Sequence, residues 1–327
     1  MKAAIVTSPG AKPTYGEFQS PLQRDGLEII DVTAAALTNL TKGRAAGSHY
    51  SADNHYPFVP GVDGVGTLAD GSRVYFALPE APFGAMAEQT LVGPRRMINL
   101  PDNLDDIAAA ALANPGMSCF AALIERARFQ AGETVLINGA TGAAGSVAVQ
   151  VAKQLGAGKV IITGRNVQEL DALRSVGADV VIPFDLRPEN PQGVEGFAQA
   201  LTAVFASGLD VVVDYLWGTS ARTIIIAVAK AVEDAHPVRF VQVGEASRES
   251  VELPGAAFRS SAIQIMGSGL KSVPLPRLLE GIRQTFDLAA RGKLYIPTEV
   301  VPLSTVSENW EASGKPRLVF AMKGKLS

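Results

Sequence analysis

The sequence predicts an α/β protein that combines a β-rich part with a doubly wound parallel sheet. Two observations point to this fold class. Proline and glycine interrupt short apolar segments as far as about residue 114, whereas strands and helices alternate after about residue 117. The second stretch also holds six nearly continuous apolar runs, which are typical of parallel strands buried on both faces.

The first part is expected to consist mainly of short strands. The alternation of apolar and turn residues places them at 1–7, 26–33, 64–68, 73–76 and 87–92. An alanine-rich helix is expected at 104–113. Asn114-Pro115-Gly116 follows it, and proline disfavours the continuation of a helix, so we expect the helix to end there.

The six parallel strands of the second part are expected at 134–138, 159–163, 180–183, 209–214, 239–243 and 262–267. Residues 184–196, which are rich in Pro, Gly and charge, are expected to form an exposed loop, and a helix at 278–291 ends at Gly292. The tail from residue 296 returns to short strands with one helix at 304–312. We expect this tail to pack against the β-rich part.

A glycine-rich turn follows the first of the six strands. It reads A-x-G-x-x-G at Ala140, Gly142 and Gly145, and the helical spacing of apolar residues over 146–155 comes directly after it. A strand, a tight turn and a helix in this order present free N–H groups to a pyrophosphate. The pattern therefore predicts a dinucleotide site, although a purely structural turn would show the same glycines.

The end of the second parallel strand indicates which dinucleotide is bound. NAD enzymes usually carry an acidic residue about 20 residues after the glycines, where it binds the ribose 2′-hydroxyl. Arg165 stands in this place, and a guanidinium can bind a 2′-phosphate through charge-assisted hydrogen bonds. We therefore expect NADPH rather than NADH; the alternative is that Arg165 is an ordinary solvated arginine.

Composition excludes several classes of protein. The net charge of −3 gives little electrostatic support for a nucleic-acid partner. The sequence has no run of about 20 apolar residues, so we expect no membrane span. The first residues are too soon interrupted by proline and glycine for a signal peptide. The single cysteine, Cys119, fits a reducing compartment and is expected to be a buried apolar residue. We therefore expect a cytoplasmic protein.

Several motifs in order along the chain resemble the medium-chain dehydrogenase/reductase superfamily, and most of all its zinc-free quinone oxidoreductase branch, the ζ-crystallin-like proteins. The segments that carry the resemblance are 59–66 (VPGVDGVG), 71–75 (GSRVY), 84–88 (GAMAE), 138–145 (NGATGAAG), 176–179 (VGAD), 210–214 (DVVVD) and 241–244 (VQVG). The resemblance implies a GroES-like catalytic domain at 1–114 and 293–327, and a Rossmann nucleotide-binding domain at 115–292. It also implies an active site in the cleft between them.

The same resemblance bears on metal. Zinc enzymes of the superfamily use Cys and His ligands, and this chain has one Cys and three His. Where those enzymes carry Gly-His-Glu, this chain has Gly61-Val62-Asp63, and valine cannot bind a metal. We therefore expect no metal, so that the acceptor must be polarised in another way, as in an enone or a quinone.

The resemblance further implies which residues act. Tyr50 occupies the place of a family tyrosine near the nicotinamide, and Asn39 stands one position from the place of a family asparagine, which aligns with Thr38. Packing roles for both remain open. The cofactor contacts implied, partly by the turn and partly by the resemblance, are Asn114, Thr141, Gly142, Ala143, Ala144, Gly145, Gly164, Arg165, Asn166, Trp217, Gly218, Val243, Gly244, Gly267, Ser268 and Gly269.

The function that we expect is NADPH-dependent transfer of hydride to a quinone or an α,β-unsaturated carbonyl. A short-chain dehydrogenase is disfavoured because none of the six tyrosines has a lysine four residues later. The alternative that stays open is a catalytically weak NADPH-binding sensor or interaction protein of the same fold. By analogy with the family, we expect a homodimer that pairs its last parallel strand, 262–267, across a two-fold axis.

Overall fold

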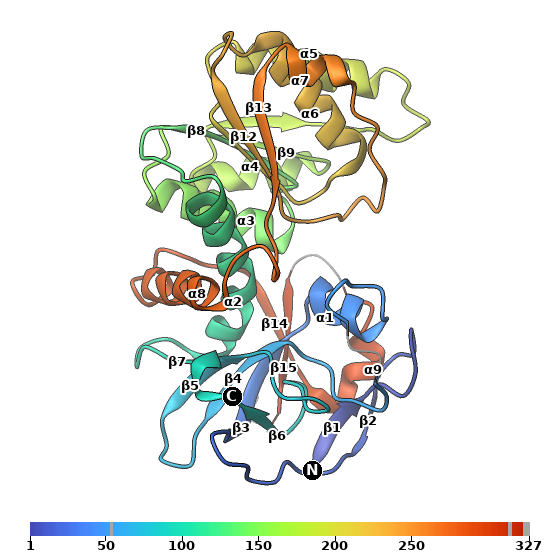
Figure 1. Cartoon of the computed structure of the whole chain (residues 1–327), viewed down its shortest axis with the longest axis vertical. Helices are drawn as coiled ribbons and strands as arrows, with labels where there is room; N and C mark the ends of the chain where they lie inside the picture. The colour runs from blue at the N-terminus through green and yellow to red at the C-terminus, as the bar shows by residue number, and fades with distance from the viewer. Residues whose placement is uncertain (53–54, 313–315, 323–327) are drawn as a thin grey trace. The chain divides into compact units, whose positions relative to one another are not determined.

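The computed structural model describes residues 1–52, 55–312 and 316–322. It divides into two compact units, Met1–Asn114 with Leu279–Ser327, and Pro115–Leu278 (Figure 1). The boundary before residue 279 falls inside helix α8 (Leu275–Ala290), whereas the sequence assigned residues as far as 292 to the second part. Each unit has its own sheet and its own core.

The first unit is built on a seven-stranded sheet of order β14-β15-β3-β4-β5-β7, in which β6 also pairs with β3. Its strands are β3 (Glu28–Ala36), β4 (Asp63–Thr67), β5 (Arg73–Ala77), β6 (Gln89–Val92), β7 (Met97–Asn99), β14 (Thr298–Pro302) and β15 (Arg317–Ala321). A two-stranded sheet pairs β1 (Lys2–Ile5) with β2 (Thr14–Glu17). Short helical elements are α1 (Asn39–Ala45), η1 (Pro94–Arg96), η4 (Leu303–Thr305) and α9 (Val306–Asn309).

The C-terminal segment is part of the first unit. Strand β15 pairs antiparallel with β3, with Phe320 opposite Ala35 in the register. Phe76, Met86 and Phe320 are fully buried in the same apolar cluster. The sheet therefore combines strands from early and late parts of the sequence. Of the helix expected at 304–312, the structure shows only a 3₁₀ turn and the four-residue helix α9.

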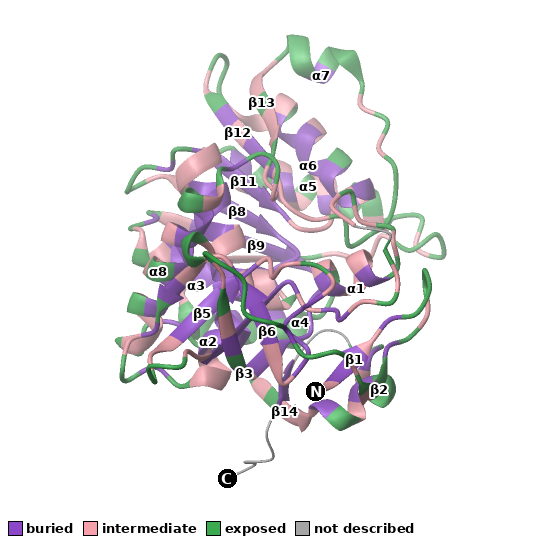
Figure 2. Cartoon of the chain, turned by 60° about the horizontal axis from the view of Figure 1, so that its bottom comes forward, coloured by how far each residue is buried: buried purple, intermediate pink, exposed green. Residues whose placement is uncertain are grey.

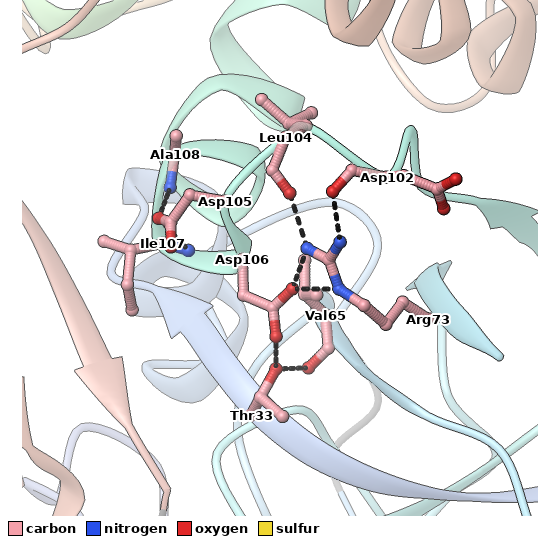
Figure 3. Close-up of polar contacts among 9 residues, drawn as sticks. All are labelled: Thr33, Val65, Arg73, Asp102, Leu104, Asp105, Asp106, Ile107 and Ala108. Carbon is pink, nitrogen blue, oxygen red and sulfur yellow. Dashed lines mark hydrogen bonds and ion pairs between the residues drawn. The ribbon is translucent and has the colours of Figure 1, made fainter. Parts of the chain in front are cut away.

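Helix α2 (Asp106–Phe120) starts at a polar junction with the sheet (Figure 3). The carboxylate of Asp106 accepts hydrogen bonds from Thr33 Oγ1 (2.7 Å) and Arg73 Nε (3.0 Å). The carboxylate of Asp105 accepts from the N–H groups of Ile107 and Ala108, as an N-cap does. These contacts fix the first turn of α2 against strands β3 and β5.

The expectation that Pro115 ends this helix is wrong. The helix passes through Pro115 and continues as a π-helix, η2 (Ala121–Arg126). A proline inside a helix costs about 3 kcal/mol. The segments on both sides of it, 109–113 and 119–123, are buried, and their packing offsets that cost. Asn114, expected in a break, therefore lies inside the helix.

The continuous helix Asp106–Arg126 also bears on the membrane question. Among the described residues it is the one helix long and apolar enough to cross a membrane by length and composition, but 67% of its most apolar window is buried inside the protein. A buried core helix passes the same test, so this helix is weak evidence for a membrane span.

The second unit is built on a six-stranded parallel sheet of order β10-β9-β8-β11-β12-β13. Its strands are β8 (Thr134–Asn138), β9 (Lys159–Gly164), β10 (Val180–Pro183), β11 (Val211–Asp214), β12 (Pro237–Gln242) and β13 (Ala262–Gly267). Numbered from β8, this is the order 3-2-1-4-5-6 of a dinucleotide-binding sheet. The helices are α3 (Ala143–Gln154), α4 (Val167–Ala172), η3 (Leu173–Val176), α5 (Gly193–Phe205), α6 (Gly218–Ala231) and α7 (Gly255–Arg259).

The central strands of this sheet are buried on both faces, as their apolar runs predict. Strands β8, β9 and β11 are coloured mainly as buried in Figure 2. Leu136, Ile161 and Val212 on these strands are fully buried. The sheet therefore holds the loops at its carboxyl edge on a rigid base. In such a sheet the order reverses between the first and fourth strands, here β8 and β11, and ligands bind at the carboxyl edge beside that point.

Candidate cofactor site

The glycine-rich turn lies at the carboxyl end of β8. Gly142 occupies the N-cap position of α3, and because it has no side chain, no N-cap side chain accepts from the first N–H groups of this helix. At Gly145 a Cβ atom would lie 2.3 Å from the carbonyl oxygen of Gly139, so only glycine permits this approach of helix and strand. The contacts predicted at Thr141, Gly142, Ala143, Ala144 and Gly145 therefore fall on a strand–turn–helix junction of the geometry that binds pyrophosphate.

The turn touches the end of the next strand. A Cβ placed on Gly164 would lie 3.3 Å from Thr141 Cγ2. Beyond Gly164, Arg165 is exposed, and Asn166 is the N-cap of α4: its Oδ1 accepts from Glu169 N–H (3.1 Å) and its Nδ2 donates to Glu169 Oε1 (2.8 Å). Asn166 therefore has a structural role as a helix cap, and Arg165 is an exposed cation directly after this strand.

A buried polar network joins the carboxyl ends of β8, β9 and β11. Asn138 Nδ2 donates to Asp214 Oδ1 (2.7 Å) and to Ser220 Oγ (2.9 Å), and Thr163 Oγ1 donates to Asn138 Oδ1 (2.6 Å). Asn138, Thr163 and Asp214 are each fully buried. Burial raises the pKa of Asp214 to about 6, because water no longer solvates its charge, while the hydrogen bonds from Leu216 and Asn138 act against this shift.

This network was not predicted from the sequence. The sequence does contain an indication of it, because each of three apolar runs ends in a polar residue: Asn138, Thr163 and Asp214. Parallel strands bring their carboxyl ends together at one edge, so three such residues were candidates for contact.

Asp214 shapes the turn that enters α6. Its carboxylate accepts from the N–H groups of Leu216 (3.0 Å) and Trp217 (3.1 Å). Trp217 has φ 64°, a conformation that costs energy in a residue with a side chain. Its indole ring lies edge-on to the Phe240 ring, with 6.4 Å between the centroids, and packs against the core of this unit.

The remaining predicted contacts lie at the ends of β12 and β13. The N–H groups of Val243 and Gly244 donate to Asp214 O (2.8 and 3.1 Å), and a Cβ on Gly244 would lie 2.7 Å from Tyr215 O. Ser268 N–H donates to Gln242 O (2.8 Å). With Gly267 and Gly269 on either side of Ser268, these residues follow the same edge of the sheet.

Three predicted residues belong to the first unit. Asn114 lies in α2 and is half-buried. Asn39 is the exposed first residue of α1, directly after the N-cap Thr38. Tyr50 is 57% exposed, and its ring centroid lies 4.1 Å from that of His49. The structure therefore brings together the predicted contacts of the second unit, while these three stand in the first.

Comparison with known proteins gives three kinds of match. The family model described as zinc-binding dehydrogenase matches residues 143–276. The chain is 28% identical over 351 aligned residues to an Emericella nidulans protein named "Probable NADPH-dependent quinone reductase tdiC". This alignment covers 95% of this chain and 96% of that protein. The chain is 32% identical to an Arabidopsis thaliana NADPH-dependent alkenal/one oxidoreductase, with 48% of this chain and 44% of that protein covered. A mycobacterial quinone oxidoreductase has the same fold, with a TM-score of 0.82 at 19% identity over 98% of this chain and 100% of the other.

These matches support the medium-chain dehydrogenase/reductase superfamily, and within it the quinone oxidoreductase branch. The match to the family model starts at Ala143, the first residue of α3, and ends in α8. It therefore covers most of the parallel-sheet unit.

The family model's description raises the question of zinc. Among residues 1–52, 55–312 and 316–322, no group of three or more His, Cys, Asp or Glu side chains comes close enough to hold a metal ion. Val62 is buried, and the neighbouring Asp63 accepts a hydrogen bond from Tyr75 OH (3.1 Å). Burial raises the pKa of Asp63 to about 6, while the Tyr75 hydrogen bond and the positive charge of Arg317 act against it. Among the described residues, the side chains available as donors therefore do not fit a zinc site.

Proposed function

We propose that the chain is an NADPH-dependent oxidoreductase that transfers hydride to a quinone or an α,β-unsaturated carbonyl without zinc. The observation that carries this proposal is the carboxyl edge of the parallel sheet. There a glycine turn, an unblocked helix N-terminus and an exposed arginine follow adjacent strands β8 and β9. Two relatives are named as NADPH-dependent reductases, one of quinones and one of alkenals and alkenones, and their names support the same substrate classes here.

In this proposal, different residues of the second unit bind different parts of NADPH. The first-turn N–H groups of α3, from Ala143 to Gly145, would bind the pyrophosphate, and Arg165 would bind the 2′-phosphate. The turns after β11, β12 and β13 would hold the nicotinamide side of the cofactor. When bound, NADPH supplies the hydride, and the protein contributes position and polarisation.

For the acceptor we propose Tyr50 and Asn39 as polarising groups. A phenol O–H or an amide N–H that donates to the acceptor oxygen stabilises the negative charge that develops there during hydride transfer. Asn114 is proposed as a further cofactor contact, through its side-chain amide. We also infer a cytoplasmic homodimer in which β13, the end strand of the parallel sheet, pairs with its copy.

Turnover with a panel of acceptors tests this function. We expect NADPH to be oxidised in the presence of quinones and of alkenals or alkenones, as measured by the loss of NADPH absorbance. We expect no inhibition by a zinc chelator. Tight NADPH binding without turnover of any acceptor would instead favour a catalytically weak sensor or interaction protein. The relatives' names do not favour that alternative.

A further inference from the structure

A second arginine lies at the carboxyl edge, after strand β10. The guanidinium of Arg187 forms a two-pronged ion pair with Asp185, with Nε 2.8 Å from Oδ1 and Nη2 2.6 Å from Oδ2. The Arg187 side chain is 72% exposed and that of Asp185 is 38% exposed. This contact fixes the plane of the guanidinium and leaves its remaining N–H donors facing solvent.

The loop that carries this pair is anchored to the sheet. Phe184 N–H donates to Gly164 O (2.9 Å), and the Phe184 ring packs against Phe197 at 4.9 Å between centroids. Asn190 Nδ2 donates to Asp185 O (3.1 Å). A Cβ on Gly193 would lie 1.8 Å from that same carbonyl oxygen, so the chain passes very close to it. The loop therefore holds Asp185 and Arg187 at a defined position beside the end of β9.

Arg165 and Arg187 approach Asp185 from two neighbouring strand ends. Gly164 pairs with Pro183 in the register of β9 and β10, so Arg165 and Asp185 follow these two strands at the same edge. The hydrogen bonds from the Arg187 side chain and backbone lower the pKa of Asp185 to about 2, and the charge of Arg165 contributes to the same shift. Two cations and one anion therefore follow the neighbouring ends of β9 and β10.

We propose that Arg187 is a second guanidinium of the 2′-phosphate subsite, next to Arg165. This inference rests on the proposed binding of NADPH. A phosphate monoester carries nearly two negative charges and three acceptor oxygens, which exceeds what one arginine can satisfy. Arg187 also neutralises the Asp185 carboxylate, which would otherwise repel the phosphate. The motif that identifies an NADP enzyme by one arginine after β9 does not include a residue after β10.

The test compares two small ligands that differ only in the 2′-phosphate: adenosine 2′,5′-bisphosphate and 5′-AMP. Their dissociation constants are measured by calorimetry on the intact protein and on the variants Arg165→Gln, Arg187→Gln and Arg174→Gln. Arg174 is the matched control, because it also pairs with an aspartate, Asp171, but contacts Asp179 O near the amino ends of β9 and β10. A double variant, Asp185→Asn with Arg187→Gln, removes the whole ion pair.

We expect the unmodified protein and Arg174→Gln to prefer the bisphosphate equally. Arg165→Gln and Arg187→Gln should each reduce this preference by about tenfold or more, with 5′-AMP affinity unchanged. The double variant should keep the reduced preference, because the direct contact is gone.

Three results would overturn the inference. If Arg187→Gln keeps the full preference while Arg165→Gln loses it, Arg187 has no part in the subsite and the proposed cofactor stands. If the double variant regains the full preference, Arg187 acts only by cancelling Asp185 and does not contact the phosphate. If the unmodified protein shows no preference at all, the proposed cofactor fails and this inference fails with it.

Discussion

Asn138 and Asp214 hold the ends of two neighbouring parallel strands together: the Asn138 Nδ2 donates to Asp214 Oδ1 at 2.7 Å, and both side chains are fully buried. The same carboxylate orders the backbone of Leu216 and Trp217, and the same amide oxygen accepts from Thr163. One buried pair therefore sets the positions of three loops at the edge where the cofactor is proposed to bind.

Replacing Asn138 tests how much this network contributes. In Asn138→Leu the buried Asp214 carboxylate loses a donor and Thr163 Oγ1 loses its acceptor, so we expect the free energy of unfolding to fall by about 2–4 kcal/mol. Urea denaturation followed by circular dichroism measures this. Asn103→Leu is the control, since the Asn103 side chain donates to Ala290 O in an exposed contact and its loss should cost less than about 1 kcal/mol. Equal losses in the two variants would show that the buried network adds no stability.

Asp63 is expected to make the free energy of unfolding fall as the pH rises. Its pKa in the folded state is raised to about 6 from an ordinary value of 3.8, so between these values the folded state binds more protons than the unfolded state. Its contribution to stability is therefore complete below about pH 4 and is lost as the pH rises through about 6. Over this window we expect Asp63 to lower the free energy of unfolding by about 3 kcal/mol.

The variant Asp63→Asn isolates this effect, because it keeps an acceptor for Tyr75 OH but cannot ionise. Denaturation at a series of pH values from 4 to 7 should show a smaller fall in stability for the variant than for the unmodified protein. Parallel curves for the two proteins would mean that Asp63 does not titrate in this range.

Gly145→Ala tests the close approach of α3 to the glycine turn. The added Cβ would lie 2.3 Å from Gly139 O, which is backbone, so the helix must shift. We expect a loss of about 1–3 kcal/mol in stability and weaker binding of NADPH, measured by denaturation and by fluorescence titration. Gly196→Ala is a matched control in helix α5, because a Cβ added at Gly196 would meet no atom within 4 Å, and it should be neutral or slightly stabilising. An unimpaired Gly145→Ala variant would contradict the tight packing.

The single cysteine should be inert in the folded protein. Cys119 is fully buried, and burial raises the pKa of its thiol well above the usual value, so the reactive thiolate is scarce at neutral pH. We expect no reaction with an aromatic disulfide reagent until the protein is unfolded, when one equivalent should react. Rapid labelling of the native protein would show that the core around Cys119 opens readily.

The parallel sheet was well predicted from sequence, because strands buried on both faces leave continuous apolar runs. The bounds of β8, β10 and β13 are those expected from the runs alone. The path of α2 was not predictable, because the packing of its buried alanines and of Leu112 outweighs the local effect of Pro115. Short elements with exposed residues, such as β2 and α1, were also missed, since Thr14–Glu17 and Asn39–Ala45 carry little periodic signal.

The candidate site was predictable where a residue type carries its own geometry. The sequence placed Gly142 and Gly145 in a strand–turn–helix junction and Arg165 directly after the next strand, as the structure has them. Their roles in binding the pyrophosphate and the 2′-phosphate stay predictions. The proposed role of Arg187 could not be predicted from the sequence. Its position near the end of β9 depends on the register of β9 and β10 and on the path of the loop after Pro183.

Arg165→Glu tests the choice of cofactor. A carboxylate beside Asp185 would repel the 2′-phosphate, so we expect NADPH affinity to fall by about 100-fold while NADH affinity changes less than about threefold. Quenching of protein fluorescence by each cofactor gives the dissociation constants. Arg174→Glu serves as the charge-matched control. If the affinities for NADPH and NADH change equally, or neither changes, Arg165 does not bind the 2′-phosphate.

The most direct measurement is a crystal structure of the protein grown with NADPH. The account predicts the pyrophosphate at the N-terminus of α3, and the 2′-phosphate within hydrogen-bonding distance of Arg165 at the ends of β9 and β10. NADPH bound with its adenosine elsewhere, or no cofactor at the carboxyl edge of this sheet at saturating concentration, would contradict it.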